Sequence, residues 1–379
     1  MRILHIIPSL RKGGAERICM DICAELNKQS GIEVKLVCLN NLIEYETANA
    51  GYDIKHIPAF ISLSLTKPAK YNIAGLDKLI QEFKPHIIHT HLFEAEIVSR
   101  SITYPQAKWF SHCHDNMHQL ETFKLDTLTN KQKLTEYYER RYILKRYRVN
   151  GGNRFIAISK DAYQYFERVL PTDLRNVTLL SNAVNTARFT KPATHVRSTD
   201  VNTLHLVTVG TLVDKKNQSF LVDVVHELVK RKQAVHLHIL GDGPNRKRLV
   251  EKTMHLDLQQ HITFHGNVQH VQDYLWNSDI YVHGAYYEPF GLAMVEAMAA
   301  GLPVVSLDGK GNRDIIRNGE NGYILPEQNK AAFADIIIAL ANNKTLYQQI
   351  LEEGFKTAQQ FDIVSYTQKL LALYQQALK

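Results

Sequence analysis

The fold class follows from one stretch, "DIYVHGAYYEPFGLAMVEAMAAGLPVVSL" (residues 279–307). A short β-branched run is followed by a turn at Pro289 and Gly291, an apolar helical segment that ends at Gly301, and a second short apolar run. Two strands joined through a helix run parallel in one sheet. The stretch therefore predicts one unit of a parallel α/β sheet.

The same alternation runs outward in both directions. Further expected strands read "ILHIIP", "VKLVCLN", "HIIHTHL" and "RFIAIS" in the first half and "TLHLVTVG", "HLHILG" and "ITFHG" in the second, with helices such as 217–232 between them. This pattern is typical of doubly wound domains. The polar stretch 191–202, "KPATHVRSTDVN", is expected to link two domains. We predict an N-terminal domain, 1–190 plus a closing helix 362–379, and a C-terminal domain, 201–361.

The composition fits two globular domains. The chain has 379 residues, of which 45% are hydrophobic and 22% charged, so disorder is excluded as its main character. The four cysteines have no zinc spacing and are interpreted as buried free thiols in a reducing cytoplasm. The opening "MRILHIIPSL" lacks a signal-peptide cleavage site, and no apolar run has the length of a membrane span. We expect a cytoplasmic protein.

Two strand-to-helix junctions favour anion binding. In "RKGGAER", Gly13 and Gly14 let the backbone approach a ligand at the start of a helix whose amides point at an anion. In "VGTLVDKKNQ", a strand ends at Gly210, and Lys215 and Lys216 follow beside the next helix, where a lysine can neutralise a phosphate. The alternatives are a plain tight turn and two solvated surface lysines.

The third junction carries two acids eight positions apart, Glu288 and Glu296. The amides of the turn residues Phe290, Gly291 and Leu292 lie at a helix N-terminus, which suits a diphosphate. Both acids can face the same crevice, and an acid beside a phosphate needs another ligand, such as sugar hydroxyls. The alternative is one glutamate at a helix N-terminus and one solvated helix glutamate.

Five motifs, which occur along the chain in the expected order, resemble the retaining glycosyltransferases of family 4. They are "EPFGLAMVE", with its E-x7-E spacing, the lysine of "VGTLVDKKNQ", "GGAER", "LLSNAVNTARF" and "NGENGYILP". The resemblance spans nearly the whole chain. It implies the α/β GT-B fold, in which two Rossmann-like doubly wound domains face a central cleft and the C-terminal helix crosses back to the N-terminal domain. It also implies that the C-terminal domain binds a nucleotide sugar and the N-terminal domain binds the acceptor.

The resemblance assigns roles to residues of this chain. Glu296 resembles the acid that holds the ribose hydroxyls, and Glu288 the acid beside the transferred sugar. Lys216 matches the lysine that binds the leaving diphosphate. Gly13 and Gly14 match the loop that closes on the donor.

The remaining assignments follow the same resemblance. Val268 lies where the family's backbone meets the base, and His114 in "FSHCHDN" resembles the acceptor-side histidine near the reacting carbon. One departure concerns Thr211, since family members commonly have an arginine at this position. Either Lys215 compensates for that missing charge, or the transition state is less well stabilised.

No metal and no cofactor are expected beside the nucleotide sugar donor, because the chain contains no Asp-x-Asp motif. Three His-x-His pairs occur: His89 with His91, His112 with His114, and His236 with His238. No third ligand lies at close spacing to any pair, so metal binding is the lesser interpretation. Without the resemblance, His114 also fits a satisfied buried histidine.

The acceptor is suggested by one basic segment. Residues 131–148 carry seven Lys or Arg against two Glu, interleaved with four tyrosines. Such a helix can lie on anionic lipid at the inner face of the cell membrane or hold a lipid-linked diphosphate, and it also fits a solvated face. Nucleic acid is disfavoured, because no binding module accompanies the charge.

The leading hypothesis is a retaining, metal-independent glycosyltransferase. It would move a sugar from a nucleotide diphosphate sugar to a glycan or lipid-linked saccharide in bacterial surface polysaccharide synthesis. One alternative is a sugar-nucleotide epimerase of similar two-domain fold, and the other is a non-catalytic sugar-nucleotide-binding partner subunit. The base and the sugar of the donor depend on loop shape, which no motif specifies.

Overall fold

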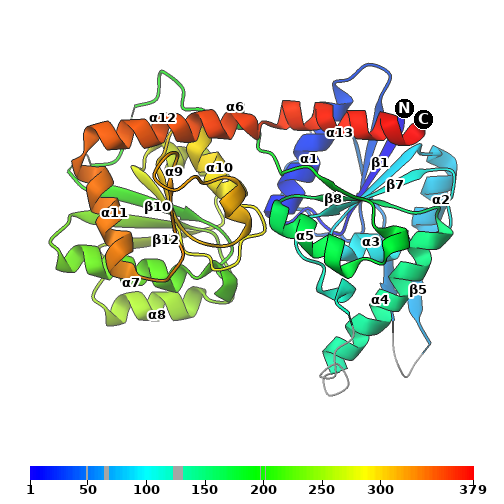
Figure 1. Ribbon diagram of the computed structural model, residues 1–379, viewed down its shortest axis with the longest axis horizontal. Helices are drawn as coiled ribbons and strands as arrows, with labels where there is room; N and C mark the ends of the chain where they lie inside the picture. The colour runs from blue at the N-terminus through cyan, green and yellow to red at the C-terminus, as the bar shows by residue number, and fades with distance from the viewer. Residues whose placement is uncertain (48–49, 64–67, 123–130, 197, 201) are drawn as a thin grey trace. The chain divides into compact units, whose positions relative to one another are not determined.

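The computed structural model describes residues 1–47, 50–63, 68–122, 131–196, 198–200 and 202–379, which form two compact units (Figure 1). Met1–Asn182 and Ile363–Lys379 make up the first unit, and Ala183–Asp362 the second. Each unit is built on a parallel sheet flanked by helices. The predicted class of doubly wound α/β domains is therefore confirmed.

A seven-stranded parallel sheet forms the centre of the first unit, in the order β3-β2-β1-β6-β7-β8-β9. Its strands are β1 (Arg2–Ile7), β2 (Glu33–Cys38), β3 (Asp53–His56), β6 (Ile87–His91), β7 (Lys108–Cys113), β8 (Arg154–Ala157) and β9 (Val177–Leu179). A separate antiparallel pair joins β4 (Phe60–Ser62) and β5 (Lys70–Asn72). The strand order reverses between β1 and β6, and open α/β sheets bind ligands at the carboxyl ends beside such a switch point.

The helices of the first unit include one from the C-terminal end of the chain. They are α1 (Gly14–Asn27), α2 (Ala74–Phe83), α3 (Phe93–Ser99), α4 (Lys131–Val149), α5 (Lys160–Val169) and α13 (Ile363–Leu378). α13 packs along α1 and against β7 (Figure 1). Its buried face contains Tyr366, Leu370 and Tyr374, whereas Leu378 is 39% exposed.

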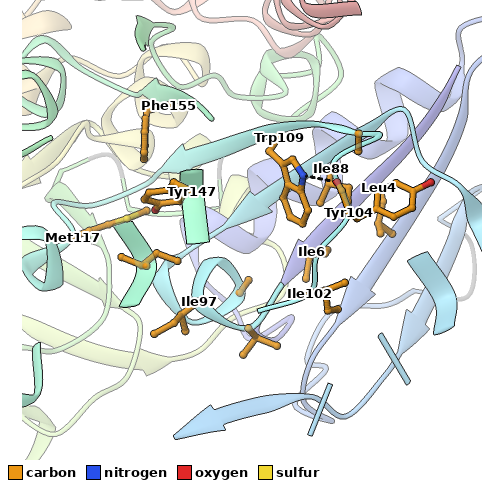
Figure 2. Close-up of a cluster of buried hydrophobic side chains, with 14 of the residues drawn as sticks. Leu4, Ile6, Ile88, Ile97, Ile102, Tyr104, Trp109, Met117, Tyr147 and Phe155 are labelled. Carbon is orange, nitrogen blue, oxygen red and sulfur yellow. Dashed lines mark hydrogen bonds between the residues drawn. The ribbon is translucent and has the colours of Figure 1, made fainter. Parts of the chain in front are cut away.

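The core of the first unit is apolar (Figure 2). Figure 2 shows side chains from β1, β6 and the segments around α3, and the Trp109 Nε1–H donates to the carbonyl of Tyr104 at 3.1 Å. Arg100 is fully buried, paired with Glu96 at 3.0 Å and lying 4.4 Å from the ring centre of Trp109. Its charge is compensated, as burial of an ion requires.

A six-stranded parallel sheet forms the second unit, in the order β12-β11-β10-β13-β14-β15. Its strands are β10 (Leu204–Val209), β11 (Val235–Leu240), β12 (Ile262–Gly266), β13 (Ile280–His283), β14 (Val304–Leu307) and β15 (Tyr323–Leu325). The helices are α6 (Thr186–Phe189), α7 (Gln218–Lys230), α8 (Arg246–His255), α9 (Val271–Trp276), α10 (Leu292–Ala299), α11 (Lys330–Asn342) and α12 (Lys344–Gln360). Here the strand order reverses between β10 and β13, so these two strands border the second switch point.

The prediction that residues 191–202 link the two units is wrong. The chain divides after Asn182 rather than at residue 190, and the stretch expected to link the units is bonded to the second one. Lys191 Nζ donates to the carbonyl of Trp276 at 2.8 Å, and the Ser198 N–H donates to Asn277 Oδ1 at 2.8 Å. A polar, aperiodic sequence is compatible with such hydrogen bonds, so its composition alone did not identify a free linker.

Candidate functional site

Lys216 and Glu288 meet across the switch point of the second unit. Lys216 ends a short 3-10 turn that follows β10, and Glu288 lies in the loop that follows β13. The Lys216 Nζ forms an ion pair with the Glu288 Oε2. Glu288 is 7% exposed, and the side chain of Lys216 is 21% exposed. Adjacency of β10 and β13 therefore joins two residues that are far apart in the sequence.

His283, at the end of β13, is the second partner of this carboxylate. Its Nε2 lies 3.0 Å from the Glu288 Oε2, and its Nδ1 lies 3.3 Å from the hydroxyl of Tyr281. Burial raises the pKa of Glu288, but the charge of Lys216 and the hydrogen bond from His283 outweigh it and lower this pKa from 4.5 to about 2. Glu288 is thus ionised at neutral pH, and neither contact uses its Oε1.

A glycine-rich loop after β14 fixes the backbone of Glu288. The Glu288 N–H donates to the carbonyl of Gly309 at 2.8 Å, and the Gly311 N–H donates to the carbonyl of Glu288 at 3.0 Å. A Cβ on Gly309 would lie 2.7 Å from the Glu288 Cβ, and one on Gly311 would lie 2.1 Å from the Pro289 oxygen. The buried Asn312 closes the loop, since its Oδ1 accepts from the Gly309 N–H at 2.9 Å. The approach of the two loops therefore requires glycine.

The start of α10 is built as the sequence predicted. Gly291 caps the helix with φ +117°, a conformation that favours glycine. Phe290 is 2% exposed and packs edge-on against Phe361 with ring centres 5.4 Å apart. The N–H groups of Met294 and Val295 donate to the Gly291 carbonyl at 3.0 and 3.3 Å, so the first turn offers the N–H groups of Leu292 and Ala293 to an anion.

Glu296 is half-buried within α10. Burial, together with the charges of Glu288 and Glu296, raises the pKa of Tyr281. The charge of Glu288 is the larger of these two charge effects. That the two acids of the E-x7-E spacing face one ligand site stays a prediction.

Three other predicted donor residues lie outside the ion pair. Thr211 is exposed, and its carbonyl accepts from Gln218 Nε2 at 3.1 Å. Lys215 Nζ lies 5.6 Å from the ring centre of Tyr287. Val268 lies in the loop between β12 and α9, and β12 is two strands away from β10. The predicted contact with the base, at Val268, and the predicted contact with the phosphate, at Lys216, therefore follow two different strands of the sheet.

In the first unit, Gly13 and Gly14 begin α1 as predicted. Gly13 is the N-cap, its N–H donates to the hydroxyl of Tyr45 at 3.2 Å, and that hydroxyl donates to the Gly13 carbonyl at 3.1 Å. A Cβ on Gly13 would lie 2.3 Å from the Glu16 Oε2. Gly14 is exposed. Tyr45 therefore stabilises this loop through two hydrogen bonds, whereas the sequence identified the loop only by its glycines.

His114 follows β7 and belongs to a stack of histidines. The ring centre of His112 lies 4.0 Å from that of His114, and the ring of His91 lies 5.2 Å from His114 and 5.1 Å from His112. His5 on β1 and His89 on β6 complete the cluster. Burial, with the charge of His112, lowers the pKa of His114 well below 6.5. His114 is therefore neutral at pH 7.

The premise that no third ligand lies near a His-x-His pair is wrong. Three groups of side chains have ligand atoms within 4.8 Å of one another: His5, Cys19 and Cys23; His5, His89 and His91; and His91, His112 and His114. The strand order β1-β6-β7 brings these side chains together from distant parts of the sequence. All four cysteines are free and buried, as expected.

The basic segment predicted at 131–148 forms α4. Part of its charge is used inside the unit, because Arg146 donates to the carbonyl of Ser101 at 2.8 Å and Arg148 pairs with Asp173 at 2.7 Å. Tyr147 is buried. Besides Arg148, the exposed basic residues are Lys131, Lys133, Arg141 and Lys145. In the part of the chain that the structure describes, no helix is long and apolar enough to cross a membrane.

The sequence did not identify His283, Gly309, Gly311 or Asn312 as parts of the site. The only signal for the loop was the "DGKGN" that follows a predicted strand, since a G-x-G after a strand marks a close backbone approach. No sequence feature pointed to His283, because its contact with Glu288 depends on the shape of the turn between them, which the sequence does not determine.

Two family models match the chain. The model described as Glycosyltransferase Family 4 matches residues 12–188, and the model described as Glycosyl transferases group 1 matches residues 195–357. These ranges correspond closely to the two structural units.

Known proteins of several bacteria are similar to the chain. The putative glycosyltransferase EpsD of Bacillus subtilis is 28% identical over 199 residues, which are 50% of this chain and 52% of that protein. The poly(ribitol-phosphate) alpha-N-acetylglucosaminyltransferase of Staphylococcus aureus is 32% identical over 139 residues, 36% of this chain and 28% of that protein. The chain thus spans about half or less of the length of these curated relatives.

A solved structure extends the similarity to the whole fold. HepE of Anabaena, in complex with UDP and glucose, matches with a TM-score of 0.78 and 18% sequence identity, over 98% of this chain and 99% of that one. This likeness, together with the two doubly wound units, shows the GT-B fold.

Proposed function

Because the chain belongs to the glycosyltransferases, we propose that it transfers a sugar from a nucleotide diphosphate sugar to a glycan or a lipid-linked saccharide, with retention of configuration and without a metal ion. The reaction would serve the synthesis of a bacterial surface polysaccharide. EpsD and the Staphylococcus aureus relative, both named as glycosyltransferases, support this assignment.

The observation that carries the proposal is the Lys216–Glu288–His283 arrangement at the switch point of the second unit. Glycosyl transfer builds positive charge on the sugar ring and negative charge on the departing diphosphate. Lys216 and the first-turn amides of α10 would stabilise the diphosphate, and Glu288 Oε1 would accept from a sugar hydroxyl. Because Lys216 and His283 compensate the charge of Glu288, this acid can lie beside a phosphate without strong repulsion.

Support for the nucleotide comes from Glu296 and from a solved neighbour. A carboxylate within a helix can accept from both hydroxyls of a ribose, and Glu296 lies in α10, the helix that follows Glu288. HepE, whose fold this chain shares, has been solved with UDP and glucose. We therefore assign Glu296 to the ribose.

We infer retention of configuration from the linkage named for a relative. We infer independence of a metal ion from the positive charges at the proposed site. The relative from Staphylococcus aureus is named for an alpha-linked product. Such a product retains the configuration of an α-linked nucleotide sugar. Among the residues that the structure describes, the three clusters at ligand spacing all lie in the first unit. The proposed diphosphate site therefore relies on Lys216 and helix amides for its positive charge.

The acceptor is assigned to the first unit. The exposed cations of α4 surround the half-exposed Tyr138, a combination that suits an anionic lipid surface or the diphosphate of a lipid-linked saccharide. His114 would contact the acceptor or the reacting sugar.

The test is turnover of Glu288→Gln, measured as nucleotide diphosphate release with UDP, GDP and ADP sugars and a bacterial lipid-linked acceptor. We expect at least a hundredfold loss of kcat in a variant that still unfolds cooperatively. Glu320→Gln, which alters an exposed pair with Arg317, is the control. Undiminished turnover in Glu288→Gln would refute the assignment. Acceptor-independent conversion of the nucleotide sugar would indicate an epimerase, and binding without turnover a non-catalytic subunit.

A further inference from the structure

Three histidines form a hydrogen-bonded file across the first sheet. His5 Nδ1 lies 2.9 Å from His91 Nε2, and His91 Nδ1 lies 2.9 Å from His114 Nε2. The rings come from β1, from β6 and from the residue that follows β7, which are consecutive strands in the sheet. Each contact joins the Nδ1 of one ring to the Nε2 of the next, so the file has a direction.

The three rings share one set of tautomers. Burial lowers the pKa of His5 to about 3 and that of His91 and His114 well below 6.5, so each ring is neutral and carries one proton. If His91 accepts at Nε2, it must donate from Nδ1. The file therefore has two joint states, with the proton on every Nδ1 or on every Nε2.

The two ends of the file distinguish these states. The His5 Nε2 and the His114 Nδ1 are buried and have no hydrogen-bond partner among the residues that the structure describes. His5 is 0% exposed, whereas the ring of His114 is half-buried although its Nδ1 is covered, so the His114 end of the file is the one nearer the surface. An unpaired buried N–H is rarer in proteins than an unpaired acceptor.

The surroundings of His5 favour a lone pair at its buried end. A ring nitrogen of His5 lies within 4.8 Å of the sulfurs of Cys19 and Cys23. Burial raises the pKa of Cys19 well above 9.0, so this thiol keeps its proton and can donate it weakly. The state with the proton on every Nδ1 thus leaves the lone pair on His5, the ring that lies near the thiols, and places the free N–H on His114.

We propose that His5 and His91 are positioning residues that hold His114 as its Nδ1–H tautomer. His114 then donates a hydrogen bond to an oxygen of the substrate and does not accept a proton at Nδ1. The tautomer is a property of the first unit alone, whereas the contact with substrate rests on the proposed function.

A metal ion in the all-histidine groups is disfavoured by the same geometry. Both of these groups include His91, and both of its ring nitrogens already lie 2.9 Å from another histidine nitrogen. A metal would need one of these lone pairs and would break the file.

The tautomers are read from long-range proton–nitrogen spectra of the full-length protein labelled with imidazole ¹⁵N-histidine, without substrate and with a chelator. Spectra of His5→Asn, His91→Asn and His114→Asn assign the signals. We expect the Nδ1–H form for His5, His91 and His114 in the unchanged protein. The Nε2–H form of His114 would overturn the proposal, and so would spectra that change when the chelator removes a bound metal.

Variants of His5 test the coupling. His5→Phe removes the donor, and His114 is expected to become a mixture of tautomers. In His5→Asn the amide N–H can replace the donor, so the Nδ1–H form should return. His89→Phe is the matched control, because His89 is equally buried in the cluster but its Nδ1 pairs with the hydroxyl of Tyr374. An unchanged His114 tautomer in His5→Phe, or an equal change in His89→Phe, would contradict the positioning role.

Turnover separates this inference from the proposed function. We expect kcat to fall about tenfold in His5→Phe, the effect of losing one hydrogen bond, with KM for the donor little changed and with recovery in His5→Asn. Normal turnover in His5→Phe despite mixed tautomers would refute the substrate contact alone. Absence of turnover in the unchanged protein would refute the proposed function while the spectra still test the file.

Discussion

Lys216 and Glu288 form an ion pair between the loops that follow β10 and β13, the two strands that flank the switch point of the second unit. The pair combines a cation suited to a diphosphate with a carboxylate suited to a sugar. Its position at the carboxyl ends of the strands is the one at which open α/β sheets bind ligands.

Lys216→Met is expected to impair both stability and turnover. The substitution leaves the Glu288 carboxylate buried with its hydrogen bond to His283 but without the charge of Lys216. The pKa of Glu288 should therefore rise, and the free energy of unfolding should fall by about 3 kcal/mol. Loss of the charge opposite the diphosphate should lower kcat at least a hundredfold. Chemical denaturation and steady-state kinetics measure the two effects. Lys247→Met, at an exposed position, should change neither, and equal effects in both variants would contradict the role of the pair.

Gly309→Ala and Lys310→Gly should have opposite effects. A Cβ on Gly309 would lie 2.7 Å from the Glu288 Cβ, so the alanine must displace the carboxylate loop and reduce turnover. Lys310 has φ +75°, and a glycine there relieves strain of about 1 kcal/mol. Thermal unfolding and turnover of the two variants check this. A Gly309→Ala variant with normal turnover would show that the loop does not position Glu288.

Acid should destabilise the first unit through its histidines. His5 has a pKa of about 3 in the folded state against 6.5 unfolded, so its contribution to stability is fully present above pH 6.5 and is lost as the pH falls toward 3. Each such histidine adds ~1.4 kcal/mol per pH unit to the slope. Denaturation between pH 4.5 and 7 is expected to show this slope, with a smaller one in His89→Phe. A flat profile would mean that these rings are not neutral and buried.

The exposed cations of α4 are expected to bind anionic membranes. The variant with Lys131, Lys133, Arg141 and Lys145 all changed to Gln should lose sedimentation with phosphatidylglycerol vesicles, and the unchanged protein should lose it at high salt. Neutral phosphatidylcholine vesicles are the control. Equal binding to both kinds of vesicle would contradict an electrostatic surface.

The sequence predicted local features of the site well. The turn at Gly291 and the helix behind it depend on neighbouring residues, and Gly13 and Lys216 follow strands whose β-branched residues are clear in the sequence. Each of these features is determined within about ten residues, the range over which periodicity and turn chemistry act.

Long-range features were not predictable in this way. The His5–His91–His114 file requires β6 to lie beside β1, and the contact of Gly309 with Glu288 requires two loops to approach each other. The strand β7 was not predicted, because the polar residues in "SHC" at its end gave no indication that this part of the strand is buried. The spacing of the histidines in the sequence thus gave no indication of the cluster, because the cluster forms only when the strands lie side by side.

The most direct test of a metal-independent nucleotide sugar site at Lys216 is the thermal unfolding midpoint with UDP, GDP and ADP sugars, in the presence of a chelator. A ligand at about 100 times its dissociation constant adds ~2.7 kcal/mol and raises the midpoint by several degrees. We predict that one nucleotide class stabilises the unchanged protein and fails to stabilise Lys216→Met at the same concentration. No stabilisation by any of the three at millimolar concentration, or equal stabilisation of the variant, would contradict the assignment.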